Sequence, residues 1–316
     1  MQSPPLRVGT DCSGMEAPIQ ALRKMGIPFE HVFASEIDTV CLQTIRANTS
    51  PSHLYEGDIR ERDHSSVPPV DLYVCGFPCQ PFSKVGEGKG LSDPRGTVFF
   101  ACAEYIRAHR PLFFVLENVI TLLTNDEGRT WRVILSTLTG LDGYSVSFSV
   151  MNTRDYGVPQ SRRRLYIVGR RGEEPFVFPP PVSEECPPVE SIVDWEDTTP
   201  PSPRGTFLKR ALDLSPLLQE RGSCFVDILQ YRSRERIPAR GFKHATCLLT
   251  TSYVWCVPMR RWASHLELLR MQGFPDDFRI VVRDSEFRKQ IGNTMSVNVL
   301  QTLFESLLSR AHTGTG

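Results

Sequence analysis

The stretch VDLYVCGFPCQPFS at residues 70–83 combines an apolar run with a loop rich in glycine and proline. Residues 71–75 have the length and composition of a buried β-strand, and Gly76 follows directly as a turn residue. Pro78 and Pro81 restrict the backbone on both sides of Cys79, because the proline ring fixes one backbone dihedral. We therefore predict a strand that places a cysteine in a stiff loop at its carboxyl end.

Strand-like and helix-like segments alternate on both sides of this stretch. Apolar runs bounded by turn residues predict strands at residues 6–10, 31–35, 54–56, 71–75, 113–116, 146–150 and 165–169. Helices are predicted at residues 17–25, 38–48 and 97–107. This alternation is typical of βαβ units, so the predicted fold class is α/β with a mainly parallel sheet and helices on both faces. Ligands of such sheets bind beyond the carboxyl ends of the strands.

The alternation stops near Arg171. Residues 175–203 contain nine prolines and a cluster of acids, which favours an irregular crossing between domains. Residues 204–243 then hold nine Lys and Arg against four Asp and Glu, a net charge of +5. Taken alone, this charge is typical of a solvated basic surface. Helix-like patterning returns in ELLRMQGFPDDF and QIGNTMSVNVLQTLFESLL near the end of the sequence.

Composition excludes several classes of protein. The 316 residues carry 36 basic and 36 acidic side chains, so the chain is not a uniformly basic binder. No run of 18 apolar residues and no apolar leader are present, which predicts a protein that is neither membrane-bound nor secreted. Its nine cysteines form no CxxC pair and no group with zinc-ligand spacing. We therefore predict no metal and no disulfide framework.

Acidic residues at two predicted strand ends suggest a small-molecule site. Glu36 lies 22 positions after Gly14, close to the spacing at which an acid binds ribose hydroxyls in dinucleotide folds. The first turn, GTDCSGMEAP, lacks the GxGxxG pattern of a pyrophosphate site. An adenosyl ligand without phosphates would therefore fit Glu36 and Asp58. Alternatively, both acids are caps or turn residues.

A thiol, an acid and two arginines are predicted at the same edge of the sheet. Cys79 is either a buried structural cysteine or a nucleophile, which would need a local field to ionise. Glu117 follows the strand at 113–116, and Arg162 and Arg164 alternate just before the strand at 165–169. Each residue alone is typical of an ordinary surface charge. Together they suit attack on a polarised heteroaromatic ring.

The motifs GFPCQPFS, LENV, QSRRR and IGNTMSV, in this order, resemble those of the DNA (cytosine-5) methyltransferases. DPRGTVFF and RMQGFPDDF resemble further segments of that family, and the resemblance extends from about Val8 to Leu300. It implies a Rossmann-like S-adenosylmethionine-dependent methyltransferase fold with a small irregular target-recognition domain. The implied catalytic domain is 1–172, completed by 284–316, and the implied recognition domain with its hinge is 173–283.

The resemblance also implies a mechanism. Cys79 attacks C6 of a cytosine, while Glu117 binds N4 and assists at N3. Arg164 contacts O2 of the base, and Arg162 supports Glu117 and the thiolate loop. C5 takes the methyl group of S-adenosylmethionine, which leaves S-adenosylhomocysteine, and loss of the C5 proton releases Cys79. The base must be flipped out of its duplex to reach this pocket, and the glycine-rich segment 83–96 would close over it.

For the cofactor, the resemblance implies that Glu36 binds the ribose hydroxyls and Asp58 the adenine amino group. The other implied cofactor residues are Ile37 and Ile59 on the adenine, Val98 in the adenosyl pocket, and Ser13, Gly14, Gly76, Asn293 and Ser296 around the methionine part. One departure concerns the family pattern FxGxGG, where this chain has Cys12, Gly14, Glu16 and Ala17. Loss of the aromatic edge predicts weaker or differently seated cofactor binding.

The implied partner is double-stranded DNA, bound by a monomer. The basic stretch would neutralise phosphates, and the implied DNA contacts are Gln80 and Ser83 in the cysteine loop and Arg232, Arg234, Arg236 and Arg240 in the recognition domain. The resemblance implies that the protein is located in the nucleus if the host is a eukaryote and in the cytoplasm if the host is a bacterium. Maintenance, de novo and restriction-linked roles all stay open, as does the target sequence.

Two other interpretations remain. Methylation of a tRNA cytosine uses the same catalytic motifs, but such enzymes carry a CFT-type segment followed by tyrosines, and Cys247-Leu248-Leu249 does not match it. A non-catalytic regulator with this fold would have lost the nucleophile, the acid or the cofactor acids. Cys79, Glu117 and Glu36 are all present.

Overall fold

The computed structural model describes residues 4–78, 94–182 and 186–311. The chain divides into two compact units, and each unit combines segments that are separated in the sequence. Unit 1 consists of Met1–Met151, Arg163–Pro180 and Leu300–Gly316. Unit 2 consists of Asn152–Arg162 and Pro181–Val299. The predicted role of residues 173–283 in recognising DNA stays a prediction.

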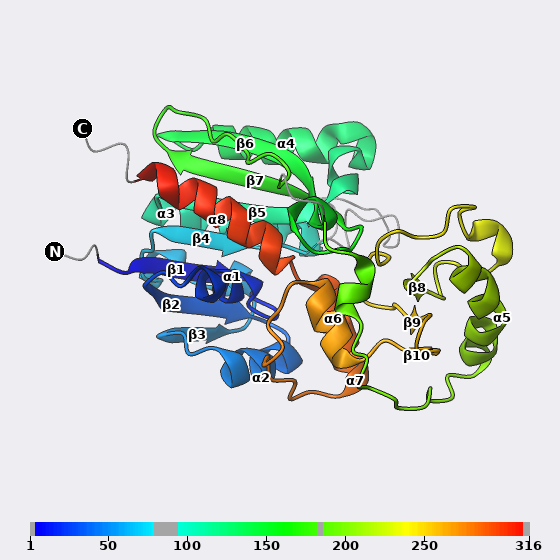
Figure 1. Ribbon diagram of the computed structural model, residues 1–316. Coiled ribbons are helices and arrows are strands. Elements are labelled where there is room, and N and C mark those ends of the chain that lie inside the picture. Colours follow the sequence, from blue (N-terminus) through cyan, green and yellow to red (C-terminus); the bar gives the residue numbers. More distant parts are fainter. Residues whose placement is uncertain (1–3, 79–93, 183–185, 312–316) are drawn as a thin grey trace. The chain divides into compact units, whose positions relative to one another are not determined.

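Unit 1 is built on a seven-stranded sheet in the order β3-β2-β1-β4-β5-β7-β6 (Figure 1). The strands are β1 (Leu6–Asp11), β2 (Phe29–Glu36), β3 (His53–Glu56), β4 (Leu72–Cys75), β5 (Phe113–Val119), β6 (Tyr144–Asn152) and β7 (Arg163–Arg171). The pairs among β1 to β5 are parallel, whereas β7 runs antiparallel to β5. The predicted α/β class with a mainly parallel sheet is confirmed.

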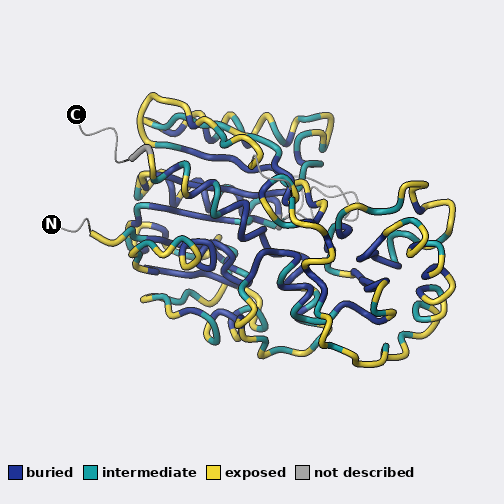
Figure 2. The backbone as a smooth tube through the Cα atoms, in the orientation of Figure 1, coloured by how far each residue is buried: buried dark blue, intermediate teal, exposed yellow. Residues whose placement is uncertain are grey.

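Helices cover both faces of this sheet. They are α1 (Ala17–Met25), α2 (Thr39–Asn48), α3 (Val98–His109), α4 (Arg129–Thr139) and α8 (Val297–Ala311), whose residues from Leu300 onward belong to unit 1. Figure 1 shows α1 and α8 in front of the sheet and α3 and α4 behind it. Behind the sheet, Phe33, Tyr73, Tyr105 and Phe114 are buried in one core cluster. The central strands are accordingly the most deeply buried part of unit 1 (Figure 2).

Unit 2 contains a three-stranded antiparallel sheet of β8 (Phe225–Asp227), β9 (Val254–Cys256) and β10 (Arg261–Trp262). Its helices are α5 (Thr206–Glu220), α6 (His265–Met271) and α7 (Asp284–Asn293). Leu214 and Leu218 on α5 pack in one cluster with Trp255 and Trp262 of the sheet. Helix α5 lies within the basic stretch, where the sequence predicted no helix. Its buried face outweighs the cost of Pro216, which interrupts the helical hydrogen bonds.

A buried ion pair connects three segments of unit 2. Both side-chain oxygens of Glu267 accept hydrogen bonds from the Arg261 guanidinium, at 2.8 and 2.9 Å, and Glu267 is fully buried. The same carboxylate accepts the backbone N–H groups of Asp194 and Ser264, at 3.0 and 2.8 Å. Glu267 therefore joins β10, the start of α6 and the proline-rich crossing. In the described part of that crossing, 175–182 and 186–203, the regular structure is a single 3₁₀ turn at Val189–Ile192, as the composition predicted.

Candidate active site

The carboxyl ends of β4 and β5 lie side by side, because the register pairs Cys75 with Leu116. The chain leaves β4 through Gly76, Phe77 and Pro78, and β5 continues into Glu117 at the same edge. Phe77 is buried and its ring centroid lies 5.6 Å from that of Phe99 on α3. The predicted nucleophile Cys79 and the predicted DNA contacts Gln80 and Ser83 lie outside the described residues.

Glu117 is a largely buried carboxylate that forms an ion pair. Its residue is 7 % exposed, and its Oε1 lies 3.2 Å from Nε of Arg164. Arg164 reaches Glu117 from β7, where it lies opposite Val119 in the antiparallel register. The guanidinium of Arg164 also donates to the carbonyl of Arg163 at 2.9 Å. The structure thus brings two of the predicted catalytic residues, Glu117 and Arg164, into direct contact within unit 1.

Asn118 fixes the backbone that leads to the cysteine loop, a role that the sequence analysis did not assign. The side chain is 1 % exposed, and its Nδ2 donates to the carbonyl of Phe77 at 3.0 Å. Its Oδ1 accepts the N–H of Val119 at 2.9 Å. A buried amide with both ends bonded to backbone holds its partners in one geometry. The third residue of the LENV motif was the available signal.

Asn118→Ala is expected to lower kcat by about 10- to 100-fold, because small misplacements of a catalytic loop are costly. The carbonyl of Phe77 would lose its buried donor, so the loop that begins there would lose its anchor. Steady-state methylation assays check this. Asn48→Ala is the control, since that side chain also donates to a backbone carbonyl, that of Thr44, at 3.0 Å. Equal rates for Asn118→Ala and Asn48→Ala would contradict an anchoring role.

Arg162 lies in unit 2 and is buried, at 2 % exposure. Its guanidinium donates to three carbonyl oxygens, those of Leu248 at 2.8 Å, Gly292 at 3.1 Å and Thr294 at 2.8 Å. These bonds tie the QSRRR segment to the segment around Leu248 and to the end of α7. Its predicted support of Glu117 and the thiolate loop stays a prediction.

The turn between β1 and α1 faces the end of β2. The N–H of Gly14 donates to Oε2 of Glu36 at 2.9 Å, and Oε1 of Glu36 accepts the N–H groups of Ile37 and Asp38 at 2.9 and 3.0 Å. Burial raises the pKa of the Glu36 carboxyl, and the three backbone N–H groups oppose this shift. The hydroxyl of Ser13 shares its proton between the carbonyl oxygens of Thr10 on β1 and Ser35 on β2, both at 3.1 Å.

Side-chain contacts of Glu16 and Asp11 hold the turn that departs from the FxGxGG pattern. Glu16 adopts a left-handed backbone conformation, with φ of 59°, which is strained for a residue with a side chain. Its fully buried carboxylate accepts the hydroxyl of Thr10 at 2.8 Å and lies 3.3 Å from His31. Nearby, Asp11 accepts both terminal nitrogens of Arg62, at 2.8 and 2.7 Å. Side-chain bonds thus fix the turn where the family pattern has glycines and an aromatic ring.

The remaining predicted cofactor residues of unit 1 differ in their surroundings. Asp58 accepts Nε of Arg60 through both oxygens, at 2.9 Å each, and these hydrogen bonds lower the pKa of the Asp58 carboxyl. Ile59 and Val98 are buried in the core cluster behind the sheet. Ile37 is 63 % exposed and directly follows the buried Glu36.

The structure places the other predicted residues in unit 2. Ser296 is buried, with its hydroxyl 2.6 Å from that of Thr153, and Asn293 is exposed at the end of α7. The four predicted DNA-contacting arginines of unit 2 are all exposed: Arg232, Arg234, Arg236 and Arg240.

The described cysteines are free thiols, and several are inert small hydrophobes. Burial raises the pKa of Cys256 to about 12, and it also holds the pKa of Cys75 well above its ordinary value. Within 4–78, 94–182 and 186–311, no three His, Cys, Asp or Glu side chains form a group that could hold a metal ion. In the same ranges, each helix is too short or too polar to cross a bilayer.

The model of the C-5 cytosine-specific DNA methylases matches residues 11–309, nearly the whole chain. The chain belongs to this family. It is 39 % identical over 279 residues to the type II methyltransferase M.NgoBI of Neisseria gonorrhoeae, an alignment that covers 86 % of this chain and 84 % of that protein. It is 36 % identical over 293 residues to M.HaeII of Haemophilus aegyptius, with 90 % and 88 % covered.

Solved structures of the same fold are similar over almost the full length. A putative DNA modification methyltransferase encoded within an E. coli prophage superposes with a TM-score of 0.72 at 20 % identity, covering 97 % of this chain and 99 % of that one. Spodoptera frugiperda DNMT2 gives 0.70 at 17 % identity, with 96 % and 99 % covered. The match to the family model and the identity to M.NgoBI and M.HaeII confirm the motif resemblance. The protein is a DNA (cytosine-5-)-methyltransferase, and its family uses S-adenosylmethionine.

Proposed function

We propose that this methyltransferase modifies cytosine in double-stranded DNA through a covalent bond between Cys79 and C6 of a flipped base, with Glu117 at the N3 and N4 edge. The observation that carries the proposal is the arrangement at the ends of β4 and β5. Glu117 is 7 % exposed and paired with Arg164, while Asn118 bonds the carbonyl of Phe77, two residues before Cys79. An acid at the end of β5 and a thiol that follows β4 by four residues in the sequence can act on one small ring.

The cofactor residues of unit 1 fit an adenosine ligand that carries no pyrophosphate. Each oxygen of Glu36 already accepts at least one backbone N–H, and Oε2, which accepts one, has capacity for a ribose hydroxyl. A Cβ added at Gly57 would meet no atom within 4 Å, and the exposed Ile37 offers an apolar surface for adenine. Asp58 would accept the adenine amino group beside Arg60.

The chain's own residues then perform distinct steps. Bound S-adenosylmethionine supplies the methyl group. The thiolate of Cys79 adds to C6, while Glu117 hydrogen-bonds N4 and supports a proton at N3 as charge moves onto the ring. The guanidinium of Arg164 keeps Glu117 oriented and offers a donor toward O2. Loss of the C5 proton expels Cys79 and ends the cycle.

Unit 2 would supply the recognition of DNA. Its exposed arginines at 232, 234, 236 and 240 are suited to phosphates and to guanine edges. We further infer that the enzyme acts as a monomer, in the cytoplasm of a bacterium, and protects DNA against a partner restriction enzyme. The support for this setting is that similar proteins from Neisseria and Haemophilus are named type II methyltransferases.

Glu117→Gln is expected to lower kcat by about 10² to 10⁴-fold, the usual contribution of a positioned acid or base. The Michaelis constants for DNA and for S-adenosylmethionine should change far less, because glutamine keeps the size and one acceptor oxygen. Glu174→Gln is the matched control, since Glu174 is an exposed partner of Arg170 at 3.0 Å. A parallel fall in kcat and in binding would instead make Glu117 a structural residue.

The decisive experiment offers duplex DNA that contains 5-fluorocytosine in varied contexts, together with S-adenosylmethionine. Fluorine at C5 cannot leave as a proton does, so a Cys79 adduct would persist and survive denaturation. Peptide mapping should locate the adduct at Cys79, and the trapped duplexes would report the target sequence. The same bases in RNA and unsubstituted cytosine in DNA serve as controls. Methylation of normal DNA without any trapped protein would refute the covalent scheme.

A further inference from the structure

A buried ion pair joins the end of β1 to the segment that follows β3. Asp11 is the last residue of β1, and its two carboxylate oxygens accept Nη1 and Nη2 of Arg62, at 2.8 and 2.7 Å. The side chain of Asp11 is fully buried, and that of Arg62 is 9 % exposed. The sequence analysis assigned no role to either residue. Two parallel bonds from a planar guanidinium fix both the position and the orientation of the two partners.

Asp11 is itself held in the centre of the sheet. Its register partners are Ser35 on β2 and Cys75 on β4. The hydroxyl of Tyr73 donates to Oδ2 of Asp11 at 2.7 Å. The carboxylate therefore offers Arg62 a fixed point at the carboxyl end of the parallel strands.

Two aromatic rings lie close to the guanidinium of Arg62. Its central carbon is 5.7 Å from the ring centroid of Phe33 on β2 and 5.3 Å from that of Tyr55 on β3. A cation within about 6 Å of the face of an aromatic ring is attracted to it. Arg62 thus contacts side chains of β1, β2 and β3 at once, which gives its own side chain a single well-defined place.

The residues just before Arg62 carry the predicted contacts to adenine. After β3 the chain forms the 3₁₀ turn η1 (Ile59–Glu61), and Arg62 directly follows it. Asp58 caps the start of η1, because its Oδ1 accepts the backbone N–H of Arg60 at 2.9 Å. At the other end, the N–H of Arg62 donates to the carbonyl of Ile59 at 3.4 Å. A single 3₁₀ turn has few internal bonds, so the place of Asp58 depends on the residue that anchors the turn.

We propose that Arg62 is a positioning residue that makes the cofactor site selective for adenine, because it holds η1 where Asp58 can accept the 6-amino group. The inference rests on the proposed adenine contact of Asp58. Both terminal nitrogens of Arg62 are bonded to Asp11, so Arg62 acts through the turn and not on the ligand. A displacement of Asp58 by about 1 Å would be enough to break its hydrogen bond to the base.

The test uses three variants of the full chain and two ligands. Arg62→Gln removes the charge that pairs with Asp11, and Arg62→Lys keeps it. Arg46→Gln is the matched control, since Arg46 pairs with Glu56 at the end of β3, but on the surface, with side chains 51 % and 52 % exposed. The ligands are S-adenosylhomocysteine and its analogue with unsubstituted purine in place of adenine. Calorimetry gives the Kd of each, and initial rates give kcat and KM for S-adenosylmethionine.

The wild type and Arg46→Gln should bind S-adenosylhomocysteine about 10- to 100-fold more tightly than the purine analogue, the usual effect of a hydrogen bond to a charged group. In Arg62→Gln this ratio should fall to about 1, because the displaced Asp58 no longer meets the amino group. KM for S-adenosylmethionine should rise by about the same 10- to 100-fold, whereas kcat at saturation should stay within about threefold. Arg62→Lys should recover part of the ratio through a single bond to Asp11.

A paired variant keeps the test valid if Arg62→Gln does not fold. Removing one partner of a buried ion pair leaves a buried charge, whereas replacing both partners is often neutral. Asp11→Asn combined with Arg62→Met leaves an acceptor for the Tyr73 hydroxyl and an apolar side chain beside the rings of Phe33 and Tyr55. It should melt near the wild-type temperature and still lose the preference for adenine.

An unchanged ratio in Arg62→Gln, or in the paired variant where that is used, would overturn the proposal, as would an equal loss in Arg46→Gln. So would an equal weakening of both ligands, because a general loss of structure does not single out the amino group. The wild type separates this outcome from a failure of the proposed function. If the wild type binds both ligands equally, the proposed adenine contact of Asp58 is wrong and the inference falls with it. If only the variants are unchanged, Asp58 keeps its role and Arg62 alone is misassigned.

Discussion

Cys79→Ala is expected to reduce methyl transfer by on the order of 10⁴-fold or more, as loss of a catalytic nucleophile generally does. The proposed contacts to the cofactor, among them Glu36 and Asp58, and the DNA contacts proposed for unit 2 do not include this sulfur. Binding of S-adenosylhomocysteine and of DNA should therefore persist. Without the thiolate, C5 of the cytosine is not activated, and no other residue can replace a covalent bond at C6.

The measurement is incorporation of labelled methyl groups into DNA, alongside calorimetric binding of S-adenosylhomocysteine. Cys186→Ala is the matched control, because Cys186 is a half-buried free thiol in unit 2 and should behave as the wild type. The Cys79 variant should also form no trapped complex with 5-fluorocytosine. Measurable turnover by Cys79→Ala, at more than a trace of the wild-type rate, would exclude this residue as the nucleophile.

Glu267→Gln is expected to lower the free energy of unfolding of unit 2 by about 3–5 kcal/mol, the usual cost of removing one partner of a buried ion pair. Glu267 accepts two hydrogen bonds from Arg261 and two from backbone N–H groups, and both residues are almost completely buried. Glutamine would leave the buried Arg261 charge with Asp197 as its carboxylate partner, at 3.4 Å from Nε, and without the paired hydrogen bonds to Glu267. Since domains are typically stable by about 5–15 kcal/mol, this loss is large.

Urea unfolding followed by tryptophan fluorescence can detect the change, because Trp255 and Trp262 lie in the core cluster of unit 2. Asp276→Asn provides the control. Asp276 pairs with Arg270 on the surface, at 57 % side-chain exposure, and such pairs contribute only about 0–1 kcal/mol. Equal midpoints for both variants would show that the Arg261–Glu267 pair does not stabilise unit 2.

Periodicity predicted the sheet of unit 1 well, because its strands are short apolar runs separated by turn residues. Each predicted strand overlaps one from β1 to β7. The antiparallel direction of β7 was not readable, since the pairing partner of a strand is set by contacts far along the chain. The helix α5 was missed for a local reason: Pro216 and dense charge obscured its apolar face, which only packing against Trp255 and Trp262 reveals.

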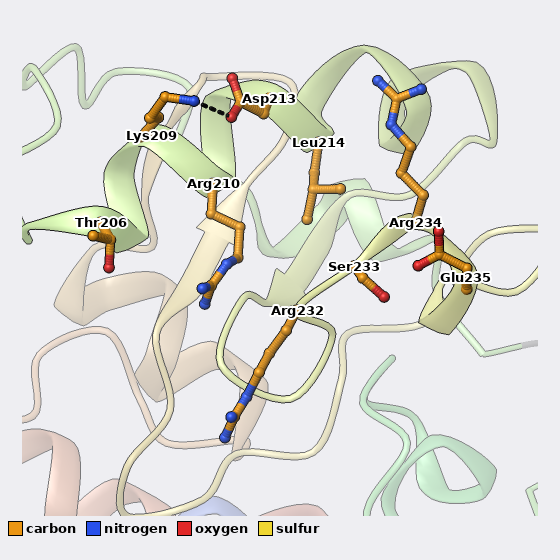
Figure 3. A pocket seen from close by; sticks show the side chains of 9 residues that line it. All are labelled: Thr206, Lys209, Arg210, Asp213, Leu214, Arg232, Ser233, Arg234 and Glu235. Atoms are coloured by element: carbon orange, nitrogen blue, oxygen red, sulfur yellow. Dashed lines mark hydrogen bonds and ion pairs between the residues drawn. The ribbon is translucent and has the colours of Figure 1, made fainter.

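The site was predicted residue by residue through motif resemblance rather than through spacing. Motifs named Glu117 and Arg164, but they could not say that these two side chains form an ion pair. They also gave no role to Asn118, whose importance depends on a hydrogen bond to Phe77, 41 positions earlier. Likewise, an open hollow of about 450 Å³ between α5 and the 3₁₀ turn η10 (Arg234–Arg236) depends on a helix that the sequence did not predict (Figure 3). Composition and periodicity do not predict contacts between residues that are far apart in the sequence.

The segmented make-up of unit 1 bears on how the polypeptide is synthesised. Unit 1 draws on residues from both ends of the sequence, with Leu300–Gly316 as its final part. Translation proceeds from the amino terminus, so this unit cannot be completed before α8 leaves the ribosome. The segments of unit 2 have all been synthesised before Leu300–Gly316, so unit 2 can fold before unit 1 is complete. The nascent chain should accordingly acquire enzymatic competence only after α8 has left the ribosome.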